Sequence, residues 1–415
     1  MALKKKPVTG MKDILPREME IRDYVIGQIK KTYASFGFTS IETPCVEHIE
    51  NLNSKSGGEN EKLIFKILKR GEKLRIQDAK KEADLVDGGL RYDLTVPLCR
   101  YYSNNAAELP SPFKALQMGS VWRADRPQRG RYRQFMQCDI DILGEPSNLA
   151  EIELITATTT LLGKLDFSRF TIRINDRRIL KAMAASCGFP EESWDDVFIT
   201  LDKMDKIGEE GVAEDLMSQG FTKESVDRYM ELFHIASPDT DGVRALRDRL
   251  TGFLDPQYAD GLVQIMESVD AVKRADFRIV FDPTLVRGMS YYTGPIFEIA
   301  MDEYGGSVGG GGRYDGMIEK FIGQSVPACG FSIGFERIIM LLLERNFQVP
   351  ESPRKKAYLL DKRLSPEQIR EAVADAMKER ESGIDVNVLV MKKNKKFQKQ
   401  QLEEEGYMEI VEVFA

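Results

Sequence analysis

The segment Arg123-Ala124-Asp125-Arg126-Pro127-Gln128-Arg129-Gly130-Arg131-Tyr132-Arg133 places five arginines within eleven residues. Strand-like stretches flank it, at 113–123 and 134–143. In the second stretch, alternation puts three polar side chains on one face: Gln137, Asp139 and Asp141. Because guanidinium groups hold phosphate oxygens in pairs, an arginine loop beside a polar sheet face predicts phosphate binding. A solvated hairpin tip is the alternative for such a charged run.

Three further segments combine glycine with aromatic or charged residues. In 285–294, glycines stand on both sides of a tyrosine pair, so backbone and rings can approach a small ligand closely. Segment 305–316 is a glycine run that ends in Arg-Tyr-Asp and lacks the acidic residue of a dinucleotide fingerprint. Segment 330–339 is a glycine-rich strand entering an apolar helix, with Arg337 at the junction. The alternative is an ordinary turn for 285–294, a flexible linker for 305–316 and a surface arginine for 330–339.

Composition excludes several classes of protein. With 415 residues, 42% hydrophobic and 30% charged, the chain predicts two or three globular domains. The five cysteines lack metal-ligand spacing, and only two histidines occur, which argues against zinc and against a histidine triad. The net charge of −7 leaves nucleic-acid binding to local patches. No apolar run is long enough for a membrane span or secretory signal, so we expect a soluble cytoplasmic protein.

Hydrophobic spacing predicts how the rest of the chain is organised. Strands are expected at 38–44 and in a hairpin formed by 63–68 and 73–77. Asn148, with Glu151 three residues later, has the spacing of a capping box at the start of a helix. A helical insertion is expected between strands at 170–174 and 277–281.

The tail forms a unit of its own. Its strands and helices alternate, which predicts a parallel sheet. Ser365, with Gln368 three residues later, is a second capping box. Two nearby prolines, Pro350 and Pro353, mark the boundary.

Taken together and in order, these segments resemble class II aminoacyl-tRNA synthetases and, within that class, the histidyl-tRNA synthetase family. The segments at 123–141 and 330–339 resemble the second and third class motifs. Those at 287–293 and 310–315 resemble the two histidine-specific signatures. Three more stretches fit the family, namely Gly10 to Pro16, Leu90 to Thr95 and Leu201 to Lys206.

The resemblance implies an α+β fold, with an antiparallel sheet flanked by helices. It implies a catalytic domain over 1–345 with a helical insertion at about 176–275. It implies a short anticodon-binding α/β domain over 354–415, although the family's domain usually continues with a further strand and helix. It also implies a homodimer built through the helix and strand around 38–44.

The implied function is a histidine–tRNA ligase, which forms histidyl-adenylate from histidine and ATP and transfers histidine to the 3′ end of tRNA(His). Mg²⁺ is the implied cofactor, and no metal-binding protein side chain is assigned. The implied ATP-binding residues are Arg123, Arg131 and Arg337, and the implied catalytic residues are Arg287, Arg123 and Arg337. The implied histidine-binding residues are Asp93, Thr95, Gln137, Asp141, Arg287, Tyr291, Tyr292 and Tyr314. The implied tRNA contacts are Arg126, Gln128, Lys392, Lys393 and Lys396.

Three rival interpretations remain open. A catalytically silent paralogue, such as the regulatory subunit of ATP phosphoribosyltransferase, would not need the full arginine set or the C-terminal domain. A class II synthetase for another amino acid would not carry the segments at 287–293 and 313–315. An RNA-binding module would not need the glycine and tyrosine segments. Ser290 departs from the family, which commonly has aspartate there.

Overall fold

The computed structural model describes residues 3–53, 60–286, 291–350 and 354–415. The chain folds into two compact units. The large unit comprises residues 1–13 and 25–345, and the small unit comprises 14–24 and 346–415. Within the described residues, none of the helices combines the length and the apolar character needed to cross a bilayer.

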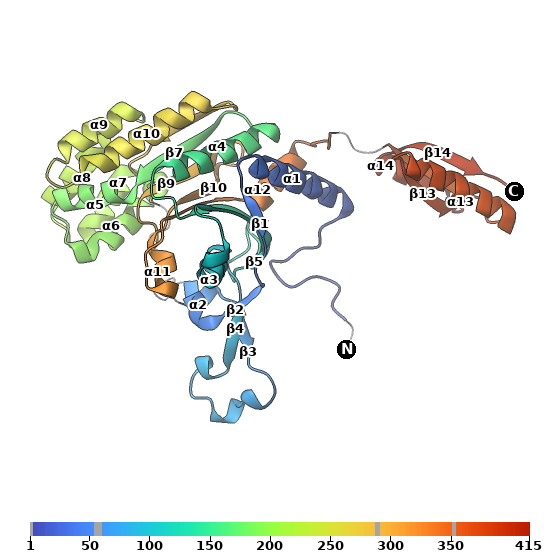
Figure 1. Cartoon of the computed structure of the whole chain (residues 1–415), viewed down its shortest axis with the longest axis horizontal. Coiled ribbons are helices and arrows are strands. Elements are labelled where there is room, and N and C mark those ends of the chain that lie inside the picture. The colour runs from blue at the N-terminus through green and yellow to red at the C-terminus, as the bar shows by residue number, and fades with distance from the viewer. Residues whose placement is uncertain (1–2, 54–59, 287–290, 351–353) are drawn as a thin grey trace. The chain divides into compact units, whose positions relative to one another are not determined.

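The large unit is built on an eight-stranded sheet with the order β1-β5-β6-β11-β10-β9-β7-β8 (Figure 1). Its central pairs are antiparallel, whereas the edge pairs β1–β5 and β7–β8 are parallel. The strands are β1 (Thr39–Ile41), β5 (Phe113–Trp122), β6 (Gln134–Leu143), β7 (Phe170–Asp176), β8 (Phe277–Phe281), β9 (Pro295–Met301), β10 (Gly306–Arg313) and β11 (Ala328–Ile333). The expected α+β fold with an antiparallel sheet is therefore confirmed.

Glycine allows β10 to pass close to β11. A Cβ added at Gly311 would lie 1.9 Å from the Gly330 carbonyl oxygen and 2.8 Å from the Phe297 ring. Any side chain at this position would therefore push the strands apart. The glycine run is a strand of the central sheet and not a flexible linker.

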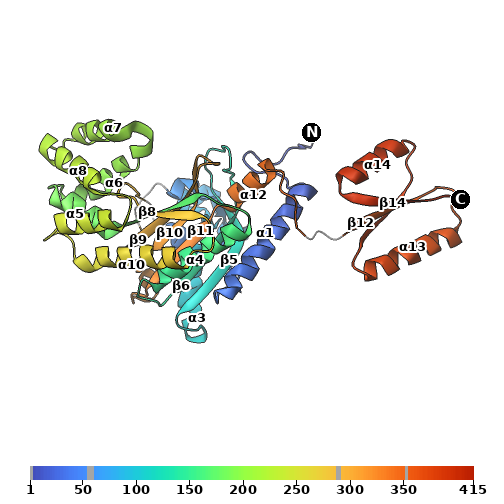
Figure 2. The same ribbon diagram turned by 90° about the horizontal axis from the view of Figure 1, so that it is seen from above.

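Helices cover this sheet and extend one end of it. Helix α4 (Leu149–Lys164) packs on β6 and β11, and α12 (Phe335–Glu344) packs on β6. Helix α3 (Thr95–Asn105) packs against α11 (Gly316–Ile322), and α1 spans Pro16–Ser35. Six α-helices lie between β7 and β8 in the sequence, namely α5 (Arg177–Ser186), α6 (Trp194–Leu201), α7 (Met204–Ser218), α8 (Lys223–Ile235), α9 (Thr240–Arg249) and α10 (Pro256–Val272). Of these, α10 packs on both strands and on α4, while α5 to α8 gather beyond that edge of the sheet (Figure 2).

Three expected strands, at 38–44, 63–68 and 73–77, differ in the structure. The stretch 73–77 is not a strand, because Ile76 is 66% exposed and no apolar face forms. Instead, β3 (Lys66–Leu68) pairs with β4 (Val86–Leu90), which also pairs with β2 (Val46–His48) before the short helix α2 (Ile49–Asn53). The strand expected at 38–44 is shortened to β1.

The capping box expected at Asn148 is wrong. Asn148 precedes α4, but its side chain donates to the Gly261 carbonyl oxygen and to Gln264. Glu151 accepts two hydrogen bonds from Arg313, at 2.7 and 2.8 Å. The Glu151 carboxylate, which would have completed the capping box, is therefore bound by the buried Arg313 guanidinium.

The small unit contains a parallel three-stranded sheet in the order β13-β12-β14, as expected. Its strands are β12 (Lys355–Leu360), β13 (Asp385–Val390) and β14 (Tyr407–Val413). Helix α13 (Pro366–Glu381) packs with Tyr358 and Leu360, and α14 (Lys395–Glu404) with the alternate residues Ala357 and Leu359. The two helices therefore cover opposite faces. The capping box at Ser365 is confirmed.

The pair Arg313–Glu151 generates a stability prediction. Both side chains are almost completely buried, so Arg313→Met would leave an uncompensated carboxylate. We expect a loss of about 3–5 kcal/mol in the free energy of unfolding. Urea unfolding followed by tryptophan fluorescence measures it, since both tryptophans, Trp122 and Trp194, lie in the large unit. The double change Arg313→Met with Glu151→Leu should recover part of the loss, and no recovery would contradict this account.

Candidate active site

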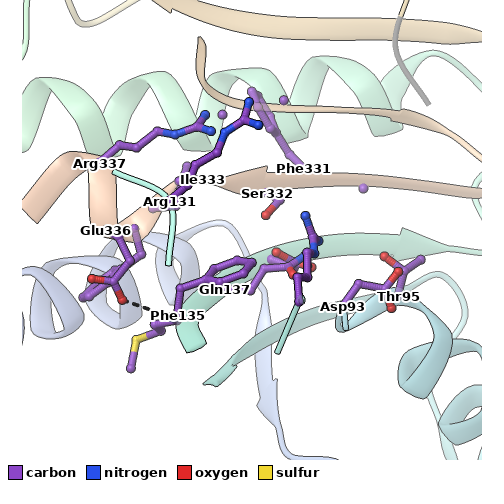
Figure 3. Close-up of a pocket in the computed structure, with 18 of the residues that line it drawn as sticks. Asp93, Thr95, Arg131, Phe135, Gln137, Phe331, Ser332, Ile333, Glu336 and Arg337 are labelled. Atoms are coloured by element: carbon purple, nitrogen blue, oxygen red, sulfur yellow. Dashed lines mark hydrogen bonds between the residues drawn. The ribbon is translucent and has the colours of Figure 1, made fainter. Parts of the chain in front are cut away.

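A pocket of about 410 Å³ opens in the large unit, over β6, β10 and β11 (Figure 3). Ten of the residues predicted from sequence line it: Asp93, Thr95, Arg123, Arg131, Gln137, Asp141, Tyr291, Tyr292, Tyr314 and Arg337. They come from segments far apart in the chain. Arg287, predicted for the same site, lies outside the described residues.

One end of the pocket is cationic. Arg131 and Arg337 lie there with Glu336 in Figure 3. The Arg337 guanidinium donates to the Ser307 carbonyl oxygen and lies 5.2 Å from the centre of the Tyr304 ring. Glu336 accepts a hydrogen bond from the Met136 backbone amide at 3.0 Å, which ties the start of α12 to β6. The Arg337 guanidinium is therefore anchored to β10 and the turn before it.

Arg123 lines the same pocket and is fixed by a backbone contact. Its Nε donates to the Tyr92 carbonyl oxygen at 2.8 Å, so its direction is set by the segment before α3. Its guanidinium carbon lies 5.2 Å from the centre of the Phe135 ring. Phe135 also lines the pocket and offers a flat apolar surface.

The other end is acidic and mostly buried. Asp93, Asp139 and Asp141 are each at most 5% exposed. Asp93 accepts a hydrogen bond from the Val96 amide at the start of α3, and Thr95 lies beside it in Figure 3. The Tyr314 hydroxyl donates to Asp141 at 2.5 Å.

Burial changes the acid–base properties of this end. Burial and, to a smaller extent, the negative charge of Asp93 raise the pKa of Asp139 to about 7. Burial, followed by the nearby Asp141 charge, also raises the pKa of Tyr314 well above its usual value. Tyr314 is therefore a hydrogen-bond donor at neutral pH.

Tyr291 and Tyr292 close one side of the pocket. Their ring centres are 4.3 Å apart, and both rings are partly buried. A Cβ added at Gly312 would lie 3.1 Å from the Tyr292 ring, so glycine leaves room for it. The site therefore combines fixed cations, a flat aromatic surface and a small acidic cavity.

Sequence reasoning did not select several residues that line the pocket: Phe135, Asp139, Ser332 and Glu336. Alternation along 134–143 had placed Asp139 on the same face as Gln137 and Asp141, so a signal for it existed. Tyr304 gave no signal, because its contacts with Arg337 and the Arg129 carbonyl oxygen depend on the folded turn between β9 and β10.

The residues predicted to contact tRNA lie elsewhere. Arg126 and Gln128 lie on the arginine-rich loop, where Gln128 and Arg131 form an isolated bridge. Lys392, Lys393 and Lys396 are exposed in the small unit. Two neighbouring lysines, Lys395 and Lys399, both pair with Glu412 of β14. The positive charge next to the predicted tRNA contacts is therefore partly neutralised by Glu412, an acid that lies more than ten residues away in the sequence.

Comparisons with known proteins agree on one family. The family model described as histidyl-tRNA synthetase matches residues 10–338. A protein of Leifsonia xyli named histidine–tRNA ligase is 46% identical over 373 residues, which cover 83% of this chain and 81% of that protein. The crystal structure of histidyl-tRNA synthetase from Nostoc sp. PCC 7120 is 26% identical and covers 98% of this chain and 90% of that one, with a TM-score of 0.79.

A third comparison concerns the fold alone. A Bacillus halodurans structure titled ATP phosphoribosyltransferase regulatory subunit/histidyl-tRNA synthetase is 21% identical to this chain. It covers 100% of both chains with a TM-score of 0.80. At this level of identity the likeness shows the fold alone.

The cationic end generates a binding prediction. Arg337→Ala should weaken the binding of inorganic tripolyphosphate about tenfold or more, since a fixed guanidinium is lost from the pocket. Calorimetric titration at constant ionic strength measures the change. Arg129→Ala is the matched control, because Arg129 pairs with Glu344 and does not line the pocket. Equal weakening in both variants would show that only overall charge matters.

Proposed function

The chain belongs to the histidyl-tRNA synthetase family, and from that premise we propose how its pocket activates histidine with ATP and esterifies it to tRNA(His). It is an aminoacyl-tRNA synthetase, an enzyme. The observation that carries the proposal is the convergence of Arg123, Arg131 and Arg337 with a buried acidic end in one pocket. A triphosphate fits the first group, and an amino acid with a cationic ammonium fits the second.

In the activation step, the histidine carboxylate attacks the α-phosphorus and pyrophosphate leaves. This reaction needs alignment and stabilisation of negative charge more than it needs a protein base. Arg123 and Arg337 would bind the phosphates, with Arg131 beside them. Arg287 would contact the carboxylate and the α-phosphate, and the Phe135 ring would support the base of ATP.

At the acidic end, Asp93 and Gln137 would hold the ammonium of histidine. Thr95, Asp141, Tyr291, Tyr292 and Tyr314 would line the cavity for the imidazole. The hydrogen bond from Tyr314 to Asp141 fixes that carboxylate, so it can accept a hydrogen bond from an N–H group of the imidazole ring. The site would therefore select its amino acid by buried acceptors at the end of the pocket away from the phosphates.

Mg²⁺ fits the phosphate end only as a partly hydrated ion. The described residues contain no cluster of three or more histidine, cysteine or acidic side chains that could hold a metal by themselves. Asp125 and Glu336 line the pocket with the arginines, and one or two carboxylates plus phosphate oxygens and water form the usual magnesium site. When bound, the ion would add positive charge beside the phosphates.

The remaining proposals concern the assembly and tRNA. Arg126 and Gln128, on the arginine-rich loop, would reach the 3′ end of tRNA. Lys392, Lys393 and Lys396 of the small unit would contact phosphates near the anticodon. We also propose a homodimer built around residues 38–44, and a cytoplasmic location. Five free cysteines are consistent with a reducing compartment.

ATP–pyrophosphate exchange should occur with histidine alone among the twenty amino acids. Arg287→Ala should lower the exchange rate about a hundredfold or more, because a donor to the developing charge is lost. Arg274→Ala, an exposed arginine on the connection between α10 and β8, serves as the control. A variant at Arg287 that retained most of its exchange activity would remove that residue from the proposed mechanism.

The exposed lysines of the small unit should affect the transfer of histidine to tRNA without affecting the activation of histidine. Changing Lys392, Lys393 and Lys396 to alanine should weaken aminoacylation and flatten its dependence on salt concentration, since fewer phosphates are neutralised. The rate of ATP–pyrophosphate exchange should not change. Lys378→Ala is the matched control in the same unit, because that lysine pairs with Asp375. Loss of exchange in the triple variant would mean that the lysines support the fold instead.

A further inference from the structure

Asp139 carries an inference beyond the assigned site residues. It lies on β6 between Gln137 and Asp141, on the same face, and lines the pocket. Its neighbours on the adjoining strands are Gln117 of β5 and Ser332 of β11. The carboxylate is 4% exposed, so its charge is buried at the centre of the sheet.

The Gln137 amide is oriented by this carboxylate. Gln137 Nε2 donates to Asp139 Oδ2 at 2.7 Å. In its ionised form the Asp139 carboxylate only accepts hydrogen bonds, and this form selects the amide orientation in which the NH₂ group faces Asp139. The Gln137 oxygen, Oε1, then remains buried without a hydrogen-bond partner among the described residues.

A buried acceptor without a donor is costly unless a ligand supplies the donor. An ammonium group is a donor only, with three N–H bonds and a positive charge. The charged groups that act on Asp139 are Asp93, which raises its pKa, and Arg123, which lowers it, and hydrogen bonding with Ser332 and Gln137 also lowers it. The two carboxylates therefore repel each other, and a cation between them would relieve that repulsion.

We propose that Asp139 is a positioning residue for the substrate ammonium: it holds the Gln137 amide with its oxygen available to the ligand and adds a second negative charge beside Asp93. This inference rests on the proposed function, in which Asp93 and Gln137 receive that ammonium. It deepens that proposal, because Asp139, next to the assigned pair, sets the direction of the Gln137 amide dipole and adds to the local negative charge.

The test uses histidine and its analogue without the amino group, 3-(imidazol-4-yl)propanoate, titrated into the full-length protein. Asp139→Asn removes the charge and allows either orientation of the Gln137 amide. We expect the affinity for histidine to fall about tenfold or more, and the affinity for the analogue to stay the same within a factor of about two. The KM for histidine in exchange should rise, with a smaller change in kcat.

Proton release gives a second measurement that a structural defect would not reproduce. Burial and the charge of Asp93 raise the pKa of Asp139 to about 7, which favours the protonated form in the free protein, whereas a bound ammonium favours the ionised form. Histidine binding to the wild-type chain should therefore release more protons than binding to Asp139→Asn. Calorimetry in buffers with different ionisation enthalpies measures the number of protons released by each protein. The titration of the substrate's own imidazole cancels in the difference between the two proteins.

Asp93→Asn separates failure of this inference from failure of the proposed site. If Asp93→Asn removes the preference for histidine over the analogue and Asp139→Asn does not, the role of Asp139 is overturned and the proposed site stands. If neither variant changes the preference, the ammonium is bound elsewhere and the proposed site fails. If Asp139→Asn weakens both ligands equally, Asp139 supports only the structure of the pocket, and the inference is overturned.

Discussion

The close approach of β10 and β11 is the constraint on which the pocket depends. These strands form the floor of the site, and glycine keeps space clear where other segments need it. A Cβ at Gly330 would lie 2.0 Å from Asp141 Oδ1 and 3.1 Å from the Tyr314 ring. The acidic end therefore exists because this part of β11 carries no side chain. The glycines belong to a rigid sheet, so the ligand meets a shape that is already formed.

Charge is separated along the pocket by the direction of the strands. The arginine-rich connection between β5 and β6 lies at one end of that hairpin, and Asp139 and Asp141 lie further along β6. A zwitterionic amino acid next to a polyphosphate has the same order of charges, from ammonium to carboxylate to phosphate. The geometry is therefore suited to aligning the two substrates by electrostatics before any bond forms. Burial at the acidic end strengthens this selection, because buried carboxylates gain more from a cation than exposed ones do.

Local sequence patterns predicted much of the fold and of the pocket. The features that depend on contacts between residues far apart in the sequence could not be predicted. The spacing of residues close together in the sequence predicts the strands at 113–122 and 134–143, the parallel sheet of the small unit and the Ser365 cap. Alternation on β6 also placed Gln137, Asp139 and Asp141 together, although their pairing in space required the structure. The fate of the cap at Asn148 could not be predicted, because Glu151 is bound by Arg313 from 162 residues away. The neutralisation of Lys395 and Lys399 by Glu412 depends in the same way on how β14 returns beside β12.

The parallel pairing of β7 with β8 restricts what the helical insertion has to provide. Parallel neighbours cannot be joined by a tight turn, because the chain must travel back along the whole strand before it re-enters the sheet. Helix α10 contacts both β7 and β8 and leads directly into β8, so one helix of 17 residues is enough for that return path. The five helices before it are not needed to complete that chain connection, although α5 also contacts β7 and α9 contacts β8. The catalytic floor therefore depends on the crossover and on these two neighbours more than on the number of helices between α5 and α9.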